Sequence, residues 1–145
     1  MPSTRRERTI AADPQRVWEL VEDPHHMPRW WPGVERMEGV EDERFTQVLY
    51  TKRGRPVRMD FRVVASEPPA RRAWEQELAG TPFERVLGQA VTEIELAACG
   101  AGRTRVAITL TQKLKGYSRT GGFLLRRATR RRLDEALEGL ERICA

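Results

Sequence analysis

From residue 34 to residue 114, turn residues divide the chain into strand-length segments, and no part keeps a helical periodicity for more than a turn or two. The clearest segment is 57–65, where Val57, Met59 and Phe61 alternate with charged residues. Such alternation predicts an antiparallel sheet with one face on a core and the other in solvent. We predict six strands in meander order, over residues 34–40, 44–52, 57–65, 74–78, 83–97 and 106–110.

Helical signals stand on both sides of this region. A first strand is predicted over residues 6–12, and the Asp13-Pro14 cap signal after it predicts a helix that ends near Glu22. A second short helix is predicted over residues 24–31. From about residue 117 to 145, Leu and Ala recur on one stripe among Arg and Glu, which predicts one long amphipathic helix.

This order of elements favours an α+β fold. A curved antiparallel sheet of about seven strands would wrap around the long C-terminal helix, with two short helices between strands one and two. Because a long sheet twists, it cannot touch the helix evenly along its length, and we expect a gap between them. Met59, Phe61, Trp74 and Ile108 would line that gap as an apolar pocket for a small molecule.

The composition sets further limits. A chain of 145 residues has the size of one domain, so we expect a single domain over residues 1–145. No apolar run approaches the roughly 20 residues of a membrane-spanning helix and no secretory signal is visible, which favours a cytoplasmic protein. Cys99 and Cys144 lie far apart without neighbouring metal ligands, so we expect no metal and no disulfide. No Gly-rich phosphate loop precedes a helix, so we expect no cofactor.

Several side chains are candidates for contact with a ligand. Trp30 and Trp31 would point about 100° apart on a helix, so one can pack while the other, Trp31, stands at the cavity mouth. Gln76 and Thr92 fall in phase with apolar neighbours and would point inward, where a ligand, a backbone group or a buried water must satisfy them. Core packing would explain the apolar candidates equally well. The predicted ligand-binding residues are Trp30, Trp31, Met59, Phe61, Trp74, Gln76, Thr92, Ile108 and Phe123.

Short motifs also occur in a characteristic order and spacing. They are Ala12-Asp13-Pro14 with Val17-Trp18, Arg29 to Val34, Pro68-Pro69 before Trp74, Gly102 to Val106, and Leu133 to Leu137. In this arrangement the chain resembles the START-like (SRPBCC) superfamily, in its polyketide cyclase/dehydrase and lipid-transport branch, over nearly its whole length. The resemblance implies a helix-grip fold whose hydrophobic cavity binds lipids, sterols, polyketides or other ring compounds. It does not fix a reaction, since carriers, cyclases, hydrolases and partner-binding modules share this fold.

Three functions follow from this interpretation. The preferred one is binding or carriage of a small hydrophobic ligand, because no catalytic constellation is evident. The second is a metal-free polyketide cyclase or dehydratase that would use Gln76, Thr92, Asp60 or an inward-facing Glu. The third is a module that binds an anionic membrane or RNA through the arginines of residues 126–132, which otherwise form a solvated face.

The remaining features are less specific. His25 and His26 are interpreted as surface residues without a catalytic role, because no nucleophile motif accompanies them. The net charge of +5 is mild and 21 acidic residues are interspersed through most of the chain. A nucleic-acid partner is therefore not favoured, whereas peripheral membrane contact stays open. The chain is expected to be a monomer or a homodimer.

Overall fold

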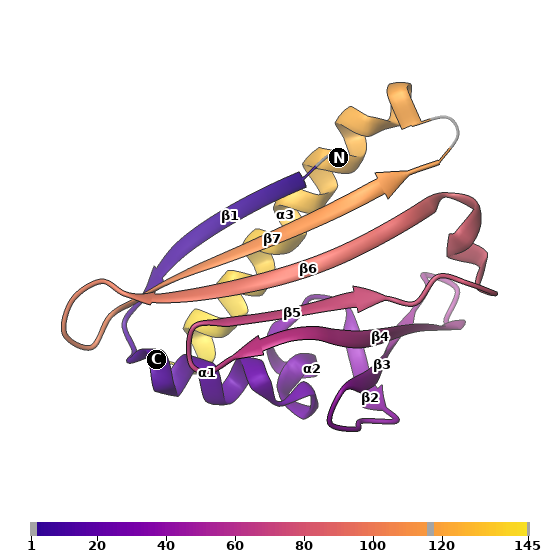
Figure 1. Cartoon of the computed structure of the whole chain (residues 1–145). Helices are drawn as coiled ribbons and strands as arrows, with labels where there is room; N and C mark the ends of the chain where they lie inside the picture. Colours follow the sequence, from indigo (N-terminus) through magenta and orange to yellow (C-terminus); the bar gives the residue numbers. More distant parts are fainter. Residues whose placement is uncertain (1–2, 116–117, 145) are drawn as a thin grey trace.

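The computed structural model describes residues 3–115 and 118–144, with the side chains of residues 118–123 left aside. Seven antiparallel strands form one open sheet in the order β1-β7-β6-β5-β4-β3-β2 (Figure 1). The strands are β1 (Ser3–Ile10), β2 (Val34–Glu38), β3 (Arg44–Tyr50), β4 (Pro56–Glu67), β5 (Arg71–Gln76), β6 (Leu87–Ala98) and β7 (Thr104–Leu114). The predicted α+β architecture, with a curved sheet around a C-terminal helix, is confirmed.

The helices α1 (Pro14–Glu22), α2 (Met27–Trp30) and the long α3 (Ser118–Cys144) lie together on one side of this sheet (Figure 1). The 3₁₀ turn η1 (Pro24–His26) joins α1 to α2, and the 3₁₀ turn η2 (Pro82–Arg85) lies in the connection between β5 and β6. Among the described residues, none of these helices combines the length and the apolar character needed to cross a membrane.

Local sequence explains the helical pair between β1 and β2. Pro14 occupies the start of α1, where its fixed φ suits the first helical turn and its missing N–H costs nothing. Asp23 begins η1, because its Oδ1 accepts a hydrogen bond from the backbone N–H of His25 at 3.0 Å. The buried face of α1 comprises Val17, Trp18, Leu20 and Val21.

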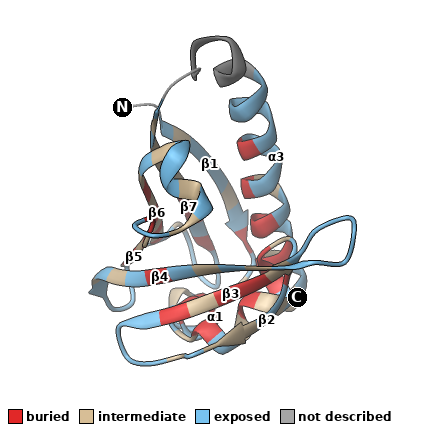
Figure 2. Ribbon diagram, turned by 90° about the vertical axis from the view of Figure 1, so that its right-hand side faces the viewer, coloured by how far each residue is buried: buried red, intermediate tan, exposed pale blue. Residues whose placement is uncertain are grey.

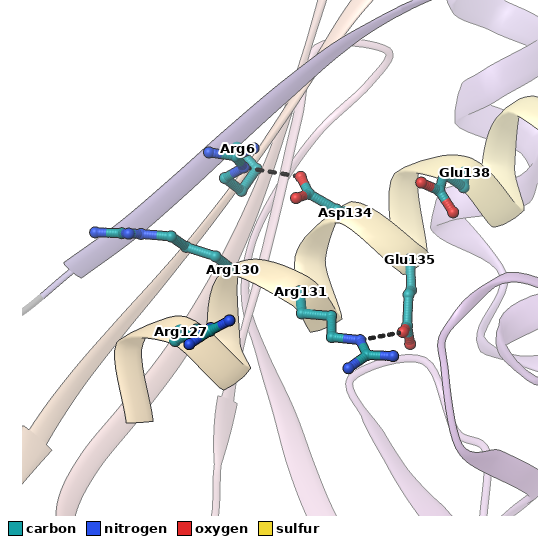
Figure 3. Close-up of a pocket in the computed structure, with 7 residues that line it drawn as sticks. All are labelled: Arg6, Arg127, Arg130, Arg131, Asp134, Glu135 and Glu138. Carbon is teal, nitrogen blue, oxygen red and sulfur yellow. Dashed lines mark hydrogen bonds and ion pairs between the residues drawn. The ribbon is translucent and has the colours of Figure 1, made fainter. Parts of the chain in front are cut away.

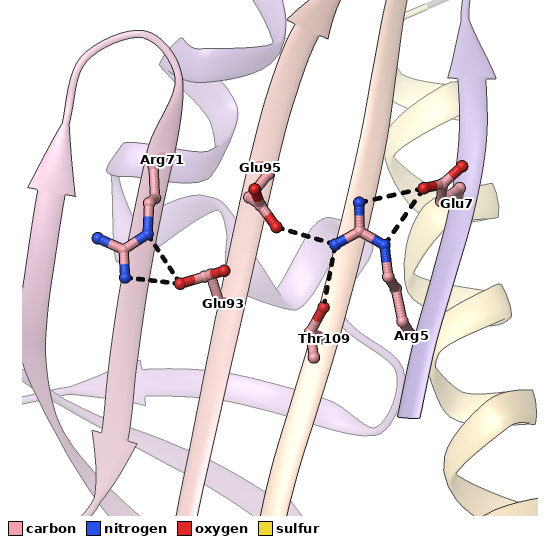
Figure 4. Close-up of polar contacts among 6 residues, drawn as sticks. All are labelled: Arg5, Glu7, Arg71, Glu93, Glu95 and Thr109. Carbon is pink, nitrogen blue, oxygen red and sulfur yellow. Dashed lines mark hydrogen bonds and ion pairs between the residues drawn. The ribbon is translucent and has the colours of Figure 1, made fainter. Parts of the chain in front are cut away.

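The core lies between the concave face of the sheet and the helices (Figure 2). Trp18, Trp74 and Phe45 are the largest fully buried side chains, and Leu133, Leu137 and Leu140 bring α3 to the same cluster. The opposite face of the sheet is polar. There Arg5 bridges to Glu95 at 2.9 Å, while Arg71 pairs with Glu93 at 2.6 Å (Figure 4). The sheet is therefore two-sided, as the alternation predicts.

Several strands begin or end at residues other than those predicted. The first strand is Ser3–Ile10, not 6–12, because the chain turns at Ala12, whose N–H donates to the Ile10 carbonyl at 2.9 Å. The predicted strand 83–97 loses its start to η2, and β6 begins only at Leu87. In the other direction, β7 is longer than 106–110, since its polar second half still pairs with β6. Two other strands differ in the same way. The strand predicted over 34–40 is β2 (Val34–Glu38), and the strand predicted over 74–78 is β5 (Arg71–Gln76).

Candidate functional site

A small, partly enclosed hollow lies between the concave face of the sheet and α3. Its volume is about 70 Å³, well below the about 300–1,000 Å³ of typical ligand pockets. Strands β3 to β7 supply its floor, and α3 closes it where Arg132 and Leu133 reach the sheet. The lining residues are Trp31, Gln47, Met59, Phe61, Trp74, Gln76, Ala90, Thr92, Leu110, Gln112, Arg132 and Leu133.

Three aromatic residues, Trp31, Phe61 and Trp74, line the hollow, and Phe45 in the core behind them connects their rings. The rings of Trp31 and Trp74 meet edge-to-face with their centroids 6.1 Å apart, and Trp74 contacts Phe45 in the same manner at 5.9 Å. Phe45 in turn stacks on Phe61 at 5.3 Å. Trp31 keeps 8% of its surface exposed, against 1% for Trp74, so Trp31 stands at the rim and Trp74 at the base. These rings offer a large apolar contact area with a defined shape.

One polar group in the lining of the hollow has no partner. Gln76 is 6% exposed, and its Nε2 is buried without a hydrogen bond in the described part of the chain. A buried amide donor left unpaired costs about 1–3 kcal/mol, so an acceptor brought from outside would gain that amount on binding. Gln47, which also lines the hollow, is better satisfied, because its Nε2 reaches the Met27 Sδ at 3.4 Å.

The other polar groups of the hollow are neutral or positive. Thr92 is 5% exposed and lies across from Trp74 in the β5–β6 register, while Gln112 lies one strand further on. Arg132 supplies the single charge among the lining residues, which include no Asp, Glu, His or Cys. The hollow can therefore donate hydrogen bonds and attract an anion, but its lining contains no side chain suited to act as a general base near neutral pH.

The structure separates the predicted site residues into distinct environments. Trp31, Met59, Phe61, Trp74, Gln76 and Thr92 all line the hollow. Trp30 and Ile108 are instead core residues, exposed by 2% and 0%. The side chain of Phe123 lies outside the described residues. Asp60, the acid/base candidate, is exposed on the outer face of β4, where it accepts a hydrogen bond from the Thr46 hydroxyl.

Gln47, Gln112 and Arg132 line the hollow but are absent from the predicted set. Gln47 falls two residues after Phe45 and could have been found from the period of the strand. Gln112 could not, because the predicted strand ends at residue 110. The charge pattern groups Arg132 with the solvated arginines, and it is indeed exposed, but it also lines the hollow beside Leu133.

The histidine pair lies away from the hollow. His25 Nδ1 is 2.8 Å from Asp23 Oδ1, and the His25 side chain is 68% exposed. Burial alone would raise the pKa of Asp23, but hydrogen bonds from the backbone and ring of His25, and the histidine charges, bring this pKa below its usual value. No group of three or more His, Cys, Asp or Glu side chains suited to hold a metal occurs among residues 3–115 and 118–144.

Comparison with known proteins supports the fold. A family model described as "Polyketide cyclase / dehydrase and lipid transport" matches residues 1–145. A search of curated proteins finds no match. Among solved structures, a START superfamily protein from Mycobacterium smegmatis is similar with a TM-score of 0.80 at 11% identity, over 98% of this chain and 96% of that one.

Two further solved structures show the same architecture. The Zhui aromatase/cyclase from Streptomyces sp. R1128 has a TM-score of 0.79 at 17% identity, covering 99% of this chain and 93% of its own. A protein from Thermus thermophilus has a TM-score of 0.77 at 24% identity, covering 97% of this chain and 95% of its own. At these identities the likeness establishes the fold and leaves the activity to be argued from the site.

Proposed function

We propose that this chain, which belongs to the polyketide cyclase/dehydrase and lipid transport family, binds a small hydrophobic molecule that presents a hydrogen-bond acceptor to Gln76. The family points to ligand binding or to a cyclase role, with a small hydrophobic compound as the partner in either case. Binding or carriage without chemistry is the function that the hollow favours.

The unpaired Nε2 of Gln76 carries this proposal. Gln76 lines the hollow together with Trp31, Phe61 and Trp74, and a buried polar donor is costly unless it is satisfied. A ketone, phenol or carboxylate oxygen of an otherwise apolar molecule would satisfy it. Arg132, at the α3 side of the same hollow, would favour a ligand whose polar end is anionic.

The hollow must widen to receive such a ligand. An apolar cavity of about 150 Å³ is known to hold benzene, roughly twice the volume found here. Two features allow widening: the ring of Trp31 stands at the rim, and residues 124–128 of α3, next to the cavity-lining part, are all exposed. Because this part of the helix has little buried surface to lose, displacing it costs little.

Cyclisation of a polyketide is the second candidate. The shape of the hollow could fold a flexible chain, and Arg132 could stabilise a developing enolate oxygen. The lining lacks a carboxylate, imidazole or thiol that could move a proton, which is why binding is preferred. A cyclase would have to rely on positioning and on the charge of Arg132.

The test is a titration that follows tryptophan fluorescence, since Trp31 and Trp74 both contact the hollow. The probes are a polycyclic aromatic ketone and the hydrocarbon of the same ring system. Gln76→Met should weaken ketone binding by about tenfold and leave hydrocarbon binding unchanged, because it removes only the donor. Gln89→Met, on the outer face of β6, is the matched control.

A ketone that binds Gln76→Met as tightly as the unaltered protein would contradict the role of the amide. Absence of binding by both probes and by a panel of fatty acids, together with no co-purified molecule in native mass spectrometry, would contradict the function itself.

A further inference from the structure

The N-terminal half of the described part of α3 carries an unusual surface. Residues 124–132, here named the basic segment, contain Leu124, Leu125, five arginines and no acidic residue. The five positive charges equal the net charge of the whole chain, so the rest of the chain is electrically balanced. Within the basic segment only Thr129 is buried.

These arginines are poorly compensated. In the described part of the chain, Arg131 reaches Glu135 at 3.3 Å, but the ion pairs found there include none from Arg126, Arg127, Arg130 or Arg132. Arg126 with Arg130, and Arg127 with Arg131, are like-charge pairs four residues apart, and each weakens the helix. A cluster that costs helix stability and makes little internal contact is suited to an external anionic partner.

The surface shape agrees with this charge. Arg127 and Arg131 stand between two open grooves of about 500 Å³ each. One groove is bordered by Arg6 of β1, which is held at 2.8 Å by Asp134, and by Arg130, with Glu135 and Glu138 on its C-terminal side, so four arginines there face three carboxylates (Figure 3). The other groove is bordered by Leu124. Both grooves are open, and the arginines that line them lie on exposed positions of the helix.

Two exposed leucines favour a membrane over a nucleic acid as the anionic partner. Leu124 is 67% exposed and Leu125 is 36% exposed, in the same two turns of helix as the arginines. Arginines beside exposed aliphatic side chains are typical of helices that lie at a bilayer surface. Single-stranded nucleic acid is usually bound with the help of aromatic side chains, and the basic segment contains none.

We propose that the basic segment docks this protein on anionic phospholipid bilayers, with arginines on the headgroups and Leu124 in the interfacial layer. This goes beyond the proposed function, since docking concerns the outer surface of α3 and requires no ligand in the hollow. Arg132 belongs both to the basic segment and to the lining of the hollow, so docking would bring the cavity close to the membrane.

Flotation with lipid vesicles tests the proposal on the full chain without added ligand. The protein should float with phosphatidylcholine vesicles that contain phosphatidylglycerol and should not float with phosphatidylcholine alone. Arg127→Glu/Arg131→Glu should lower the partition coefficient at least about 30-fold, given about fivefold per basic residue at the surface. The control Arg53→Glu/Arg55→Glu changes the net charge equally in the exposed β3–β4 turn and should bind much better than the helix variant.

A second variant measures the apolar contribution to vesicle binding apart from the contribution of charge. Leu124→Ser should weaken flotation about fivefold without changing its dependence on salt, because it removes buried apolar area and no charge. All variants change exposed residues, and circular dichroism verifies that they fold.

Equal flotation with neutral vesicles, or equal losses for the helix and turn variants, would overturn the proposal. So would tight, salt-sensitive binding to polyuridylate in the absence of any vesicle binding, which would assign the surface to RNA. Ligand binding in the hollow is measured separately, so either proposal can fail alone.

Discussion

In the part of α3 whose side chains the structure describes, the stretches before and after residue 132 differ in burial. After residue 132, Leu133, Ala136, Leu137 and Leu140 are at most 1% exposed and join the core (Figure 2). Before it, residues 124–128 are exposed on every side of the helix. One continuous helix therefore has a half that holds the fold together and a half that leaves its surface to other molecules.

Interactions outside the core strengthen this contrast. Arg8 and Arg6 of β1 pair with Glu141 and Asp134, both in the packed half, at 2.9 Å and 2.8 Å. Gly139 lets the backbone of α2 approach α3 closely.

The hollow lies where the two halves of α3 meet, since Arg132 and Leu133 both line it. Displacement of the exposed half could thus open the hollow while the packed half keeps the sheet in place.

The largest effect is expected from a comparison of two leucines, one in each half of α3. Leu137→Ala should lower the free energy of unfolding by about 2–5 kcal/mol, because it leaves a cavity in the core. Leu124→Ala should change it by less than about 0.5 kcal/mol, because that side chain is 67% exposed. Urea denaturation followed by circular dichroism measures both. Similar losses at the two positions would show that the exposed half is packed in solution.

A smaller effect is expected at Gly139. An alanine Cβ there would lie 2.5 Å from the carbonyl oxygen of Trp30 and 2.8 Å from its Cα, so one helix must shift. We expect Gly139→Ala to destabilise the protein by about 1–3 kcal/mol.

Helix propensity alone predicts the opposite sign, a gain of about 1 kcal/mol. Ala128→Gly in the exposed half is the matched control and should lose about 1 kcal/mol by propensity only. A stabilised Gly139→Ala variant in thermal denaturation would refute the close approach of α2 and α3.

The smallest effect concerns the pair between Arg8 and Glu141. The hydrogen bond from Arg8, followed by its charge, lowers the pKa of Glu141 in the folded chain below its usual value. The pair therefore contributes its full stability above the unfolded-state value of 4.5, and that contribution is lost as pH falls through the lower folded-state pKa. Both side chains are about 40% exposed, so the effect is small.

Glu141→Gln should be slightly less stable than the unaltered protein at pH 7, and the difference should shrink as the pH is lowered through the folded-state pKa of Glu141. Paired melting curves at neutral and acidic pH measure this difference. A deficit that persists undiminished in acid would mean that Glu141 acts through packing and not through its charge.

Much of this architecture was predictable because it depends on periodicity. Alternation in β4 identified the inward side chains Met59 and Phe61, and the stripe of leucines identified the packed half of α3. The size of the hollow was not predictable, since it depends on how far the rings of Trp31 and Trp74 fill the gap. Nor did periodicity distinguish Ile108, buried in the core, from Trp74, buried beside the hollow.

The unpaired amide of Gln76 shows a second limit. Its inward direction followed from the phase of β5, but whether a neighbour would satisfy it depended on contacts between strands far apart in sequence. The two halves of α3 were likewise not separable from sequence, because Leu125 falls on the same predicted apolar stripe as Leu133 and Leu137, yet the structure leaves it 36% exposed.

A crystal structure of the protein grown with a polycyclic aromatic ketone tests the central claim most directly. We predict one molecule between Trp31, Trp74 and Leu133, with its oxygen about 2.9 Å from the Nε2 of Gln76 and the hollow enlarged toward α3. An interior without ligand, closed around the same rings while the compound lies elsewhere or is absent, would contradict the claim that this hollow is a binding site.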